Sequence, residues 1–323
     1  MNHVGTLAAL CAVAAALPAV AQTSAISIYG RLDLGITHQN SGTTNLNGGN
    51  GATGAAGKRW DVRQSSGNRL GFRGTEDLGR GWKAGFHIEH RFRADSGAAD
   101  NPFWAARSIV ELGSPYGAVY LGREYIPLFW TAVELDPWRF ETTAMFGSRH
   151  QFAGYSIDGG VRSLNTVGYK SPKWGGFTAQ LATALGEGAR ERSASANLQY
   201  KRGPWFFGGG FDRVDSNRRL ALIGGTYDFG VVRPMLTFSR STVAGIDARN
   251  LSVGATAPVG PGQLRVGFAR YSPDGANNDI DKLGLGYVHP LSKRVSLYAD
   301  IGSAKQEGRS RTTAMDAGIK YNF

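Results

Sequence analysis

The chain has 323 residues, of which 46 are glycine, and its formal net charge is +11. This length fits one large domain or two ordinary ones, and glycine stands at about twice its usual share of roughly 7%. The lysines and arginines are scattered along the chain, with never more than two in a row, which argues against a nucleic-acid partner.

The first 21 residues have the pattern of a secretory signal peptide. A short apolar run, Leu7–Leu17, precedes Pro18 and the small-residue site Ala19-Val20-Ala21, and this run is too short for a membrane-spanning helix. We therefore expect the mature chain to begin at Gln22. The only cysteine, Cys11, lies inside the apolar run, so we expect the exported protein to contain no disulfide.

After this segment, apolar and polar residues alternate with period two along most of the chain, which predicts β-strands with two different faces. Near the beginning, Ile28 and Leu32 share one face while Arg31 and Asp33 occupy the other. The last segment, which ends at Phe323, alternates in the same way. A period of two would scatter these side chains around a helix, so amphipathic helices do not explain the pattern.

We count roughly 16 such strands at a length of about ten residues, which is typical of membrane barrels. The number of strands is larger than in a soluble β-sandwich. Tight turns such as Asp77–Gly81 and Pro290–Lys293 alternate with longer polar stretches such as Gln39–Gly57 and Ser272–Asp279. A sheet can span a bilayer only as a closed barrel, because no backbone polar group can stay unpaired there. The sequence therefore predicts an all-β fold in which residues 22–323 form a 16-stranded antiparallel transmembrane β-barrel with periplasmic termini.

Short segments spread in order along the mature chain are similar to those of a known family. They are Ile28–Asp33, Asn68–Gly79, Tyr120–Glu124, Val167–Pro172, Tyr227–Gly230, Leu291–Arg294 and Tyr321–Phe323. Together they resemble the trimeric general porins of Gram-negative bacteria, in particular the β-proteobacterial branch. The resemblance implies an outer-membrane location, a homotrimer, and a third external loop that folds into the pore as its constriction.

The resemblance also implies which residues line the constriction. The basic wall residues are Arg31, Arg69, Arg123 and Arg162. The third loop should run from about Glu124 to Val161, and its acidic residues Glu134, Asp136 and Glu141 would face the basic wall. The family's Pro-Glu-Phe-Gly stretch is not reproduced in this loop, where Asp136-Pro137-Trp138-Arg139-Phe140 stands instead.

Further lumen candidates are Arg73, Lys83 and Arg139. Two of the assignments have alternatives in the sequence. Arg31 could pair with Asp33 on the wall. Strict alternation places Arg123 on the face of Val119 and Leu121, so its lumen role rests on the resemblance alone.

Around this constriction the basic groups outnumber the acidic ones, and the sign of the charge at close range decides which ions pass. We therefore expect a porin for passive diffusion of small hydrophilic solutes and ions, with a preference for anions. Small ions and polar solutes, outer-membrane lipid and lipopolysaccharide are the expected partners. Strand alternation places Arg91 and Arg93 on the inward face, and contacts with lipopolysaccharide phosphates near a strand end are the alternative for these two.

Two other functions remain open. One is a substrate-selective channel of the same barrel, for phosphate or organic acids, which would show saturable conductance. The other is a barrel enzyme such as an outer-membrane protease or phospholipase. The chain has no Gly-x-Ser-x-Gly, His-Glu-x-x-His or Walker motif. His87 and His90 fall on opposite faces of one strand, which argues against a metal bound by both. We therefore expect no enzyme, no cofactor and no metal; a role as an adhesin would be compatible with the pore.

Overall fold

The computed structural model describes residues 25–46, 57–155, 161–187, 192–275 and 278–323. The predicted signal peptide of residues 1–21 and the predicted mature N-terminus at Gln22 lie outside these residues. The elements are β1 (Ala25–Gln39), β2 (Arg59–Arg63), β3 (Asn68–Gly79), β4 (Trp82–Phe92), β5 (Arg107–Ser114), β6 (Gly117–Tyr125), α1 (Pro127–Glu134), α2 (Gly147–Gln151), β7 (Arg162–Lys170), β8 (Phe177–Ala184), β9 (Ser193–Arg202), β10 (Trp205–Arg213), β11 (Arg218–Tyr227), β12 (Arg233–Val243), β13 (Ile246–Val259), β14 (Gly262–Pro273), β15 (Ile280–Pro290), β16 (Val295–Gln306) and β17 (Thr312–Asn322).

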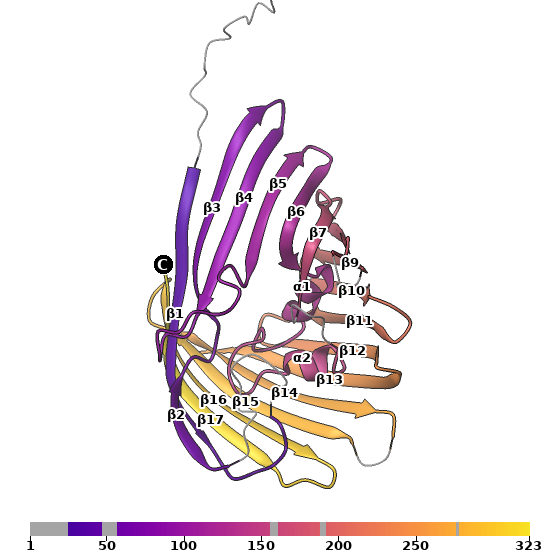
Figure 1. Cartoon of the computed structure of the whole chain (residues 1–323). Coiled ribbons are helices and arrows are strands. Elements are labelled where there is room, and N and C mark those ends of the chain that lie inside the picture. The colour runs from indigo at the N-terminus through magenta and orange to yellow at the C-terminus, as the bar shows by residue number, and fades with distance from the viewer. Residues whose placement is uncertain (1–24, 47–56, 156–160, 188–191, 276–277) are drawn as a thin grey trace, which may run out of the picture.

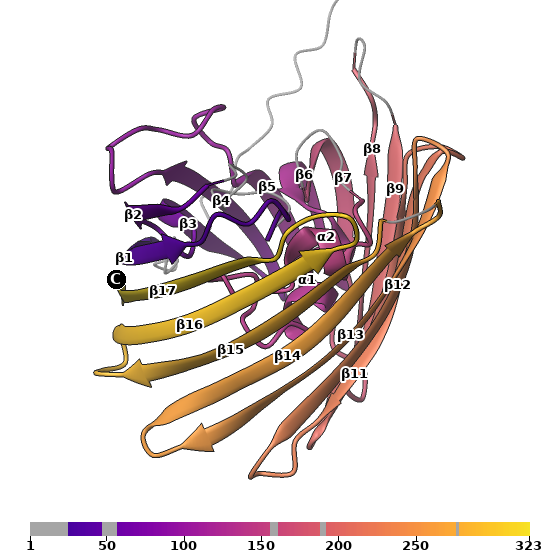
Figure 2. The same ribbon diagram turned by 90° about the horizontal axis from the view of Figure 1, so that it is seen from below.

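The strands form one antiparallel sheet that closes on itself (Figures 1 and 2). From β3 onward each strand pairs with the next along the chain, and β17 returns to pair with β1. β1 pairs with β3 over Ala25–Arg31 and with β2 over Gly35–Gln39, so β2 and β3 are two parts of one barrel strand. The structure is therefore a closed 16-stranded antiparallel barrel, which confirms the predicted fold class.

The two faces of the sheet differ in the way that the alternation predicts. Apolar side chains on one face are exposed, for example Ile26 at 70% and Ile28 at 63% of their surface. The opposite face carries buried polar side chains, including Asp33 and Thr37 of the same strand. A bilayer requires this arrangement of a barrel, with apolar side chains outward and polar ones inward. We refer to the polar face below as the inner face.

Residues 126–161 connect β6 to β7 and contain both helices; we call this stretch the β6–β7 segment. It coincides closely with the third loop that the sequence predicts at Glu124–Val161. No helix among the described residues is long and apolar enough to cross a membrane.

The β6–β7 segment packs against the inner face of the sheet. The amide of Asn197 donates a hydrogen bond of 2.7 Å to the Pro127 carbonyl. The indole of Trp138 donates to Asp300 at 2.7 Å, and the Thr143 hydroxyl donates to Asp316 at 2.9 Å. Three buried polar side chains of the barrel wall therefore hold the segment at points well separated along its length.

A line of inner-face glycines makes room for this packing. We call it the glycine track; it consists of Gly208, Gly224, Gly254, Gly267, Gly284 and Gly302. A Cβ atom at any of these positions would lie within 2.7 Å of an atom of the β6–β7 segment. Gly254, Gly267, Gly284 and Gly302 are directly opposite one another on four adjacent strands. The wall is therefore shaped to receive the segment, since only glycine allows so close an approach.

Candidate functional site

A cavity of about 900 Å³ lies between the β6–β7 segment and the inner faces of β1, β3, β4 and β5. Nine arginines line it, against three carboxylates, those of Glu89, Asp100 and Glu141. The arginines are Arg31, Arg69, Arg73, Arg91, Arg93, Arg107, Arg139, Arg149 and Arg162. The cavity is therefore strongly basic.

Three of these arginines form a row across three adjacent barrel strands. In the sheet register Arg31 of β1 is directly opposite Arg69 of β3, and Arg69 is directly opposite Arg91 of β4. Like charges in direct cross-strand positions destabilise a sheet. The row therefore requires anionic or hydrogen-bond-accepting groups close by.

Glu89 and a backbone carbonyl stabilise the row on the side of Arg69 and Arg91. The Glu89 carboxylate lies 2.8 Å from the Arg91 guanidinium and 3.9 Å from that of Arg69, and it accepts a 2.7 Å hydrogen bond from the Tyr29 hydroxyl. The carbonyl of Gly67 accepts hydrogen bonds from Arg69 at 3.2 Å and from Arg91 at 2.9 Å. A single buried carboxylate, that of Glu89, thus offsets the repulsion between two arginines.

The carbonyl of Gly67 is available because the barrel strand is interrupted between β2 and β3. The carboxylate of Asp33 accepts hydrogen bonds from the backbone N–H groups of Ser65 at 3.2 Å and Ser66 at 3.1 Å, and from the Ser66 hydroxyl at 2.5 Å. The Tyr298 hydroxyl donates to the same carboxylate at 2.7 Å. The partners of the Asp33 carboxylate are therefore other groups of the barrel wall. Asp33 does not form the ion pair with Arg31 that the sequence left open.

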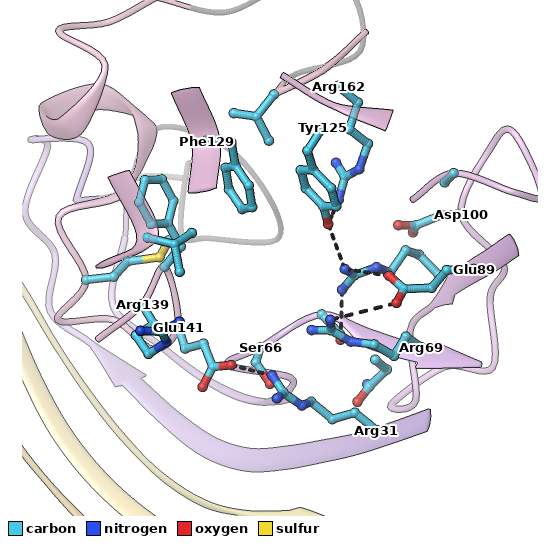
Figure 3. A pocket seen from close by; sticks show the side chains of 18 of the residues that line it. Arg31, Ser66, Arg69, Glu89, Asp100, Tyr125, Phe129, Arg139, Glu141 and Arg162 are labelled. Atoms are coloured by element: carbon cyan, nitrogen blue, oxygen red, sulfur yellow. Dashed lines mark hydrogen bonds and ion pairs between the residues drawn. The ribbon is translucent and has the colours of Figure 1, made fainter. Parts of the chain in front are cut away.

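The Tyr125 hydroxyl joins two further arginines at the edge of the cavity. It accepts hydrogen bonds from Arg91 at 2.9 Å and from Arg162 at 2.7 Å (Figure 3). The guanidinium of Arg162 also lies over the Tyr125 ring, 4.4 Å from its centre. A hydroxyl that accepts two charged donors fixes both arginines in place without neutralising either one.

Glu141 is the carboxylate that the β6–β7 segment contributes to the arginine row. It forms ion pairs with Arg31 and, at 2.5 Å, with the amine of Lys320 (Figure 3 shows the contact with Arg31). Burial opposes ionisation of this carboxyl group, but Arg31, Lys320 and Arg69 outweigh burial and lower the pKa of Glu141 to about 2. The side chain is therefore an anion held between two cations.

The β6–β7 segment presents aromatic rings to the remainder of the cavity. Phe129, Trp130 and Phe140 line it from this side and are only half-buried. The Phe129 ring stacks on Tyr125 with 4.4 Å between ring centres and lies 5.5 Å from Phe140. One wall of the cavity is therefore basic and the facing one is largely aromatic.

The structure brings together most of the residues that the sequence proposes for this site. Arg31, Arg69, Arg162 and Glu141 all line the cavity, as do the further candidates Arg73 and Arg139. The guanidinium of Arg73 lies over the Tyr29 ring at 5.4 Å.

Two predicted basic residues are placed elsewhere. Arg123 donates a 2.8 Å hydrogen bond to the Ala105 carbonyl and does not line the cavity. Lys83 shares the inner face of β4 with Glu89, but it lies at the other end of the strand beside the short turn at Arg80. Lys83 is therefore exposed at the rim and does not reach the cavity.

Two predicted acidic residues also lie outside the cavity lining. Glu134 forms ion pairs with Arg139 at 2.9 Å and with Arg233 at 3.7 Å. Asp136 is buried and accepts hydrogen bonds from the backbone N–H groups of Trp138 and Phe140. Burial raises the pKa of Asp136 to about 6, although these hydrogen bonds lower it in part. Asp136 therefore supports the fold of the segment and does not face the arginine wall.

Several cavity residues were not predicted as parts of the constriction. Arg91 and Arg93, predicted on the inward face with lipopolysaccharide contacts as the alternative, line the cavity. Arg107, which pairs with Glu124, and Tyr125 were missed. Strand alternation identifies the inward direction of Arg91, because it shares a face with Glu89. No pattern in the sequence marks Tyr125, whose role depends on the two arginines that meet at its hydroxyl.

Comparisons with known proteins agree with this architecture. The sequence profile of a family described as Gram-negative porin matches residues 6–309. Outer membrane porin protein 32 of Delftia acidovorans is 30% identical, over 97% of this chain and 93% of that protein. Major outer membrane protein P.IB of Neisseria meningitidis serogroup B is 26% identical, over 96% and 97%.

Among solved structures, an anion-selective porin from Comamonas acidovorans superimposes with a TM-score of 0.79 at 26% identity. The match covers 93% of this chain and all of that one. The profile match spans most of the chain, and the curated relatives match over nearly their whole length. The chain therefore belongs to the Gram-negative porins and is an outer-membrane β-barrel protein.

Proposed function

We propose that this porin forms a water-filled channel for passive diffusion of small hydrophilic solutes and ions, with a preference for anions. The observation that carries the proposal is the lining of the cavity, in which nine arginines outnumber three carboxylates. In a narrow passage with low-dielectric walls, excess positive charge favours anions over cations. The similar porin from Comamonas acidovorans is described as anion-selective, which supports the same assignment.

The constriction of this channel is, in our proposal, the cavity between the arginine row and the β6–β7 segment. The segment would act as a third external loop folded into the pore. The glycine track and the hydrogen bonds to Asn197, Asp300 and Asp316 support this role, because they hold the segment against the inner face. Arg31, Arg69, Arg91 and Arg162 would form the basic wall, and Glu141 would neutralise part of it.

The assembly and maturation of the protein are inferred from the resemblance to the trimeric porins and from the signal-peptide pattern. We propose a homotrimer that is exported by residues 1–21 and begins at Gln22 after cleavage. The relatives named above are porins, and we propose that this chain acts as a channel and not as an enzyme. Semi-native electrophoresis tests the trimer, and N-terminal sequencing of the purified protein tests the cleavage site.

An arginine cluster on the outer face supports lipopolysaccharide as a partner. Arg213 of β10 is directly opposite Arg219 of β11, and Arg240 of β12 is directly opposite Arg249 of β13. All four are exposed at the end of the barrel where β6 runs into the β6–β7 segment, beyond apolar side chains such as Phe238. We call them the outer arginine cluster. Arg240 pairs with Asp247 at 2.9 Å and Arg249 lies 3.9 Å from Asp274, and phosphates of outer-leaflet glycolipid would supply further anions to the opposed cations.

Swelling of proteoliposomes tests the channel. Vesicles with the purified protein should swell in isosmotic solutions of small neutral and anionic solutes, at rates that fall with solute size and rise linearly with concentration. Rates that saturate for one anion would favour the substrate-selective channel instead. Vesicles that do not swell, although the protein migrates as a folded barrel, would contradict a diffusion channel.

A further inference from the structure

The acidic side chains of the β6–β7 segment do not form a negative surface opposite the arginine wall. Glu134 is paired with Arg139 and Arg233, and Asp136 is buried within the segment. Glu141 is held between Arg31 and Lys320. Beside Arg139 and Arg149, the segment lines the cavity with apolar side chains, those of Phe129, Trp130, Phe140, Val133 and Met145.

The aromatic surface directly adjoins the guanidinium groups. Arg162 covers the Tyr125 ring at 4.4 Å, and Tyr125 in turn stacks on Phe129 (Figure 3). Arg107 lies 5.8 Å from the Trp130 ring centre, and Trp130 lies 5.3 Å from Phe129. A solute a few ångströms long could therefore contact a guanidinium and an aromatic face at the same time.

Two of the arginines have capacity for an incoming carboxylate. Within the described part of the chain, no carboxylate lies within ion-pair distance of Arg162, whose hydrogen-bond partner is the Tyr125 hydroxyl. The nearest carboxylate to Arg69 is that of Glu89 at 3.9 Å, and Glu89 is in closer contact with Arg91. By contrast, Arg31 and Arg107 already have close carboxylate partners.

We propose that this cavity is a binding site for aromatic carboxylates of the benzoate class. The carboxylate would be held by Arg69 and Arg162, and the ring would pack against Phe129 and Trp130. Charge-assisted hydrogen bonds and ring stacking would then act on opposite ends of one solute. This inference rests on the proposed passage of anions and adds a solute class to it.

Block of the chloride current by added solutes tests the site. Single-channel conductance in potassium chloride at neutral pH is measured while sodium benzoate, sodium acetate, inorganic phosphate or benzyl alcohol is added. Benzoate should reduce the current saturably, with a half-blocking concentration about tenfold below that of acetate. Benzyl alcohol and phosphate should be no more effective than acetate, because benzyl alcohol lacks the negative charge and phosphate lacks the aromatic ring.

Substitutions identify the contacts. Phe129→Leu and Trp130→Leu keep apolar bulk but remove the ring, so each should raise the half-blocking concentration of benzoate about three- to tenfold with little effect on acetate. Arg162→Gln should weaken the block by both carboxylates. Tyr116→Leu is the matched control, because Tyr116 is 81% exposed in the turn between β5 and β6 and does not line the cavity. Heat-modifiable migration on gels reports whether each variant is folded.

Equal block by benzoate and acetate in the unaltered protein would overturn the aromatic carboxylate site, as would a benzoate block that neither ring substitution weakens. If the channel is nevertheless anion-preferring by its reversal potential, the proposed function stands and only the solute class is wrong. A cation-preferring reversal potential would instead remove the proposed function on which the site depends.

Discussion

Arg31, Arg69 and Arg91 lie directly opposite one another on neighbouring strands, so their charges repel unless other groups lie between them. Glu89 and Glu141 provide these groups, and each contacts two cations. The carboxylates of the cavity therefore stabilise the arginine row more than they attract cations from solution. The arginines in excess of the carboxylates determine the electrostatic field that a solute meets.

Replacing Glu141 tests this account of the carboxylates. Glu141→Gln leaves Arg31 and Lys320 without their acidic partner and raises the positive charge at the cavity by one. The ratio of anion to cation permeability should increase about two- to threefold, as expected for one charge at a distance of several ångströms in water. Reversal potentials measure the ratio, with Glu76→Gln, an exposed residue outside the cavity lining, as control. An unchanged or lower ratio would contradict the account.

The pKa of Glu141 also predicts how stability depends on pH. Because the pKa is lowered to about 2, the stabilisation by Glu141 is fully present above the ordinary carboxyl pKa of about 4.3 and is lost as pH falls through about 2. The difference in unfolding temperature between the unaltered protein and Glu141→Gln should be constant from about pH 8 to about pH 5. It should shrink between about pH 4 and about pH 2.

Heat-modifiable migration on gels, after incubation at each pH, measures the two unfolding temperatures. Titration of Asp136, whose pKa is about 6, affects both proteins alike and cancels in the difference. If the difference has already disappeared at about pH 6, Glu141 is not held ionised by its cationic partners.

At the scale of the elements, the β6–β7 segment and the wall that receives it depend on each other. The glycine track removes side chains where the segment lies, and Asn197, Asp300 and Asp316 bind it along its length. The position of the aromatic surface in the cavity is therefore determined by residues of β9 to β17, far from the arginine row in sequence.

A methyl group on the glycine track should disturb this fit. A Cβ at Gly302 would lie 2.3 Å from the Thr143 carbonyl oxygen, a backbone atom, so Gly302→Ala requires the segment to shift. We expect a loss of about 1–3 kcal/mol in the free energy of unfolding and a changed single-channel conductance. Gly113→Ala is the control, because its nearest neighbour would be 3.7 Å away. Equal behaviour of the two variants in gel shift and conductance would contradict the role of the track.

The strands were predictable from the sequence because an apolar, outward-facing residue recurs at every second position of a strand. This alternation does not depend on the conformation of the loops. The bounds predicted for the third loop, Glu124–Val161, agree with the interval between β6 and β7 for the same reason. The interruption between β2 and β3 could not be predicted, since it depends on Asp33 reaching Ser65 and Ser66 across the sheet.

The candidate site was predictable only in part. Arg31, Arg69 and Arg162 come from the resemblance and line the cavity, whereas Arg123 does not. The acidic residues of the loop could be identified as a group, but their separate roles depend on how the segment folds. Of the three, Glu141 alone lines the cavity, while Asp136 accepts hydrogen bonds from its own backbone.

At the scale of the whole molecule, positive charge is present on both sides of the barrel wall. The inner arginines face the passage, and the outer arginine cluster lies at the end of the barrel where β6 runs into the β6–β7 segment. Arg240 and Arg249 have 61% and 66% of their side-chain surface exposed. The two sets serve different partners in our proposal: small anions inside and glycolipid phosphates outside.

Substitution in the outer arginine cluster tests the lipid contact. Arg240→Gln combined with Arg249→Gln should weaken binding of purified lipopolysaccharide to the detergent-solubilised protein about five- to tenfold, with unchanged channel conductance. Arg202→Gln combined with Arg294→Gln, two exposed arginines at the opposite end of the barrel, should bind as the unaltered protein does. Native mass spectrometry measures the bound lipid. Equal binding by both double variants would contradict the assignment of this cluster.

The reversal potential of the purified protein in a planar bilayer, under a potassium chloride gradient, tests the anion preference most directly. We predict a potential of the anion-permeable sign, and a smaller one for Arg69→Gln combined with Arg162→Gln, because two of the cations that line the cavity are then removed. A potential of the cation-permeable sign from the unaltered protein would contradict the account.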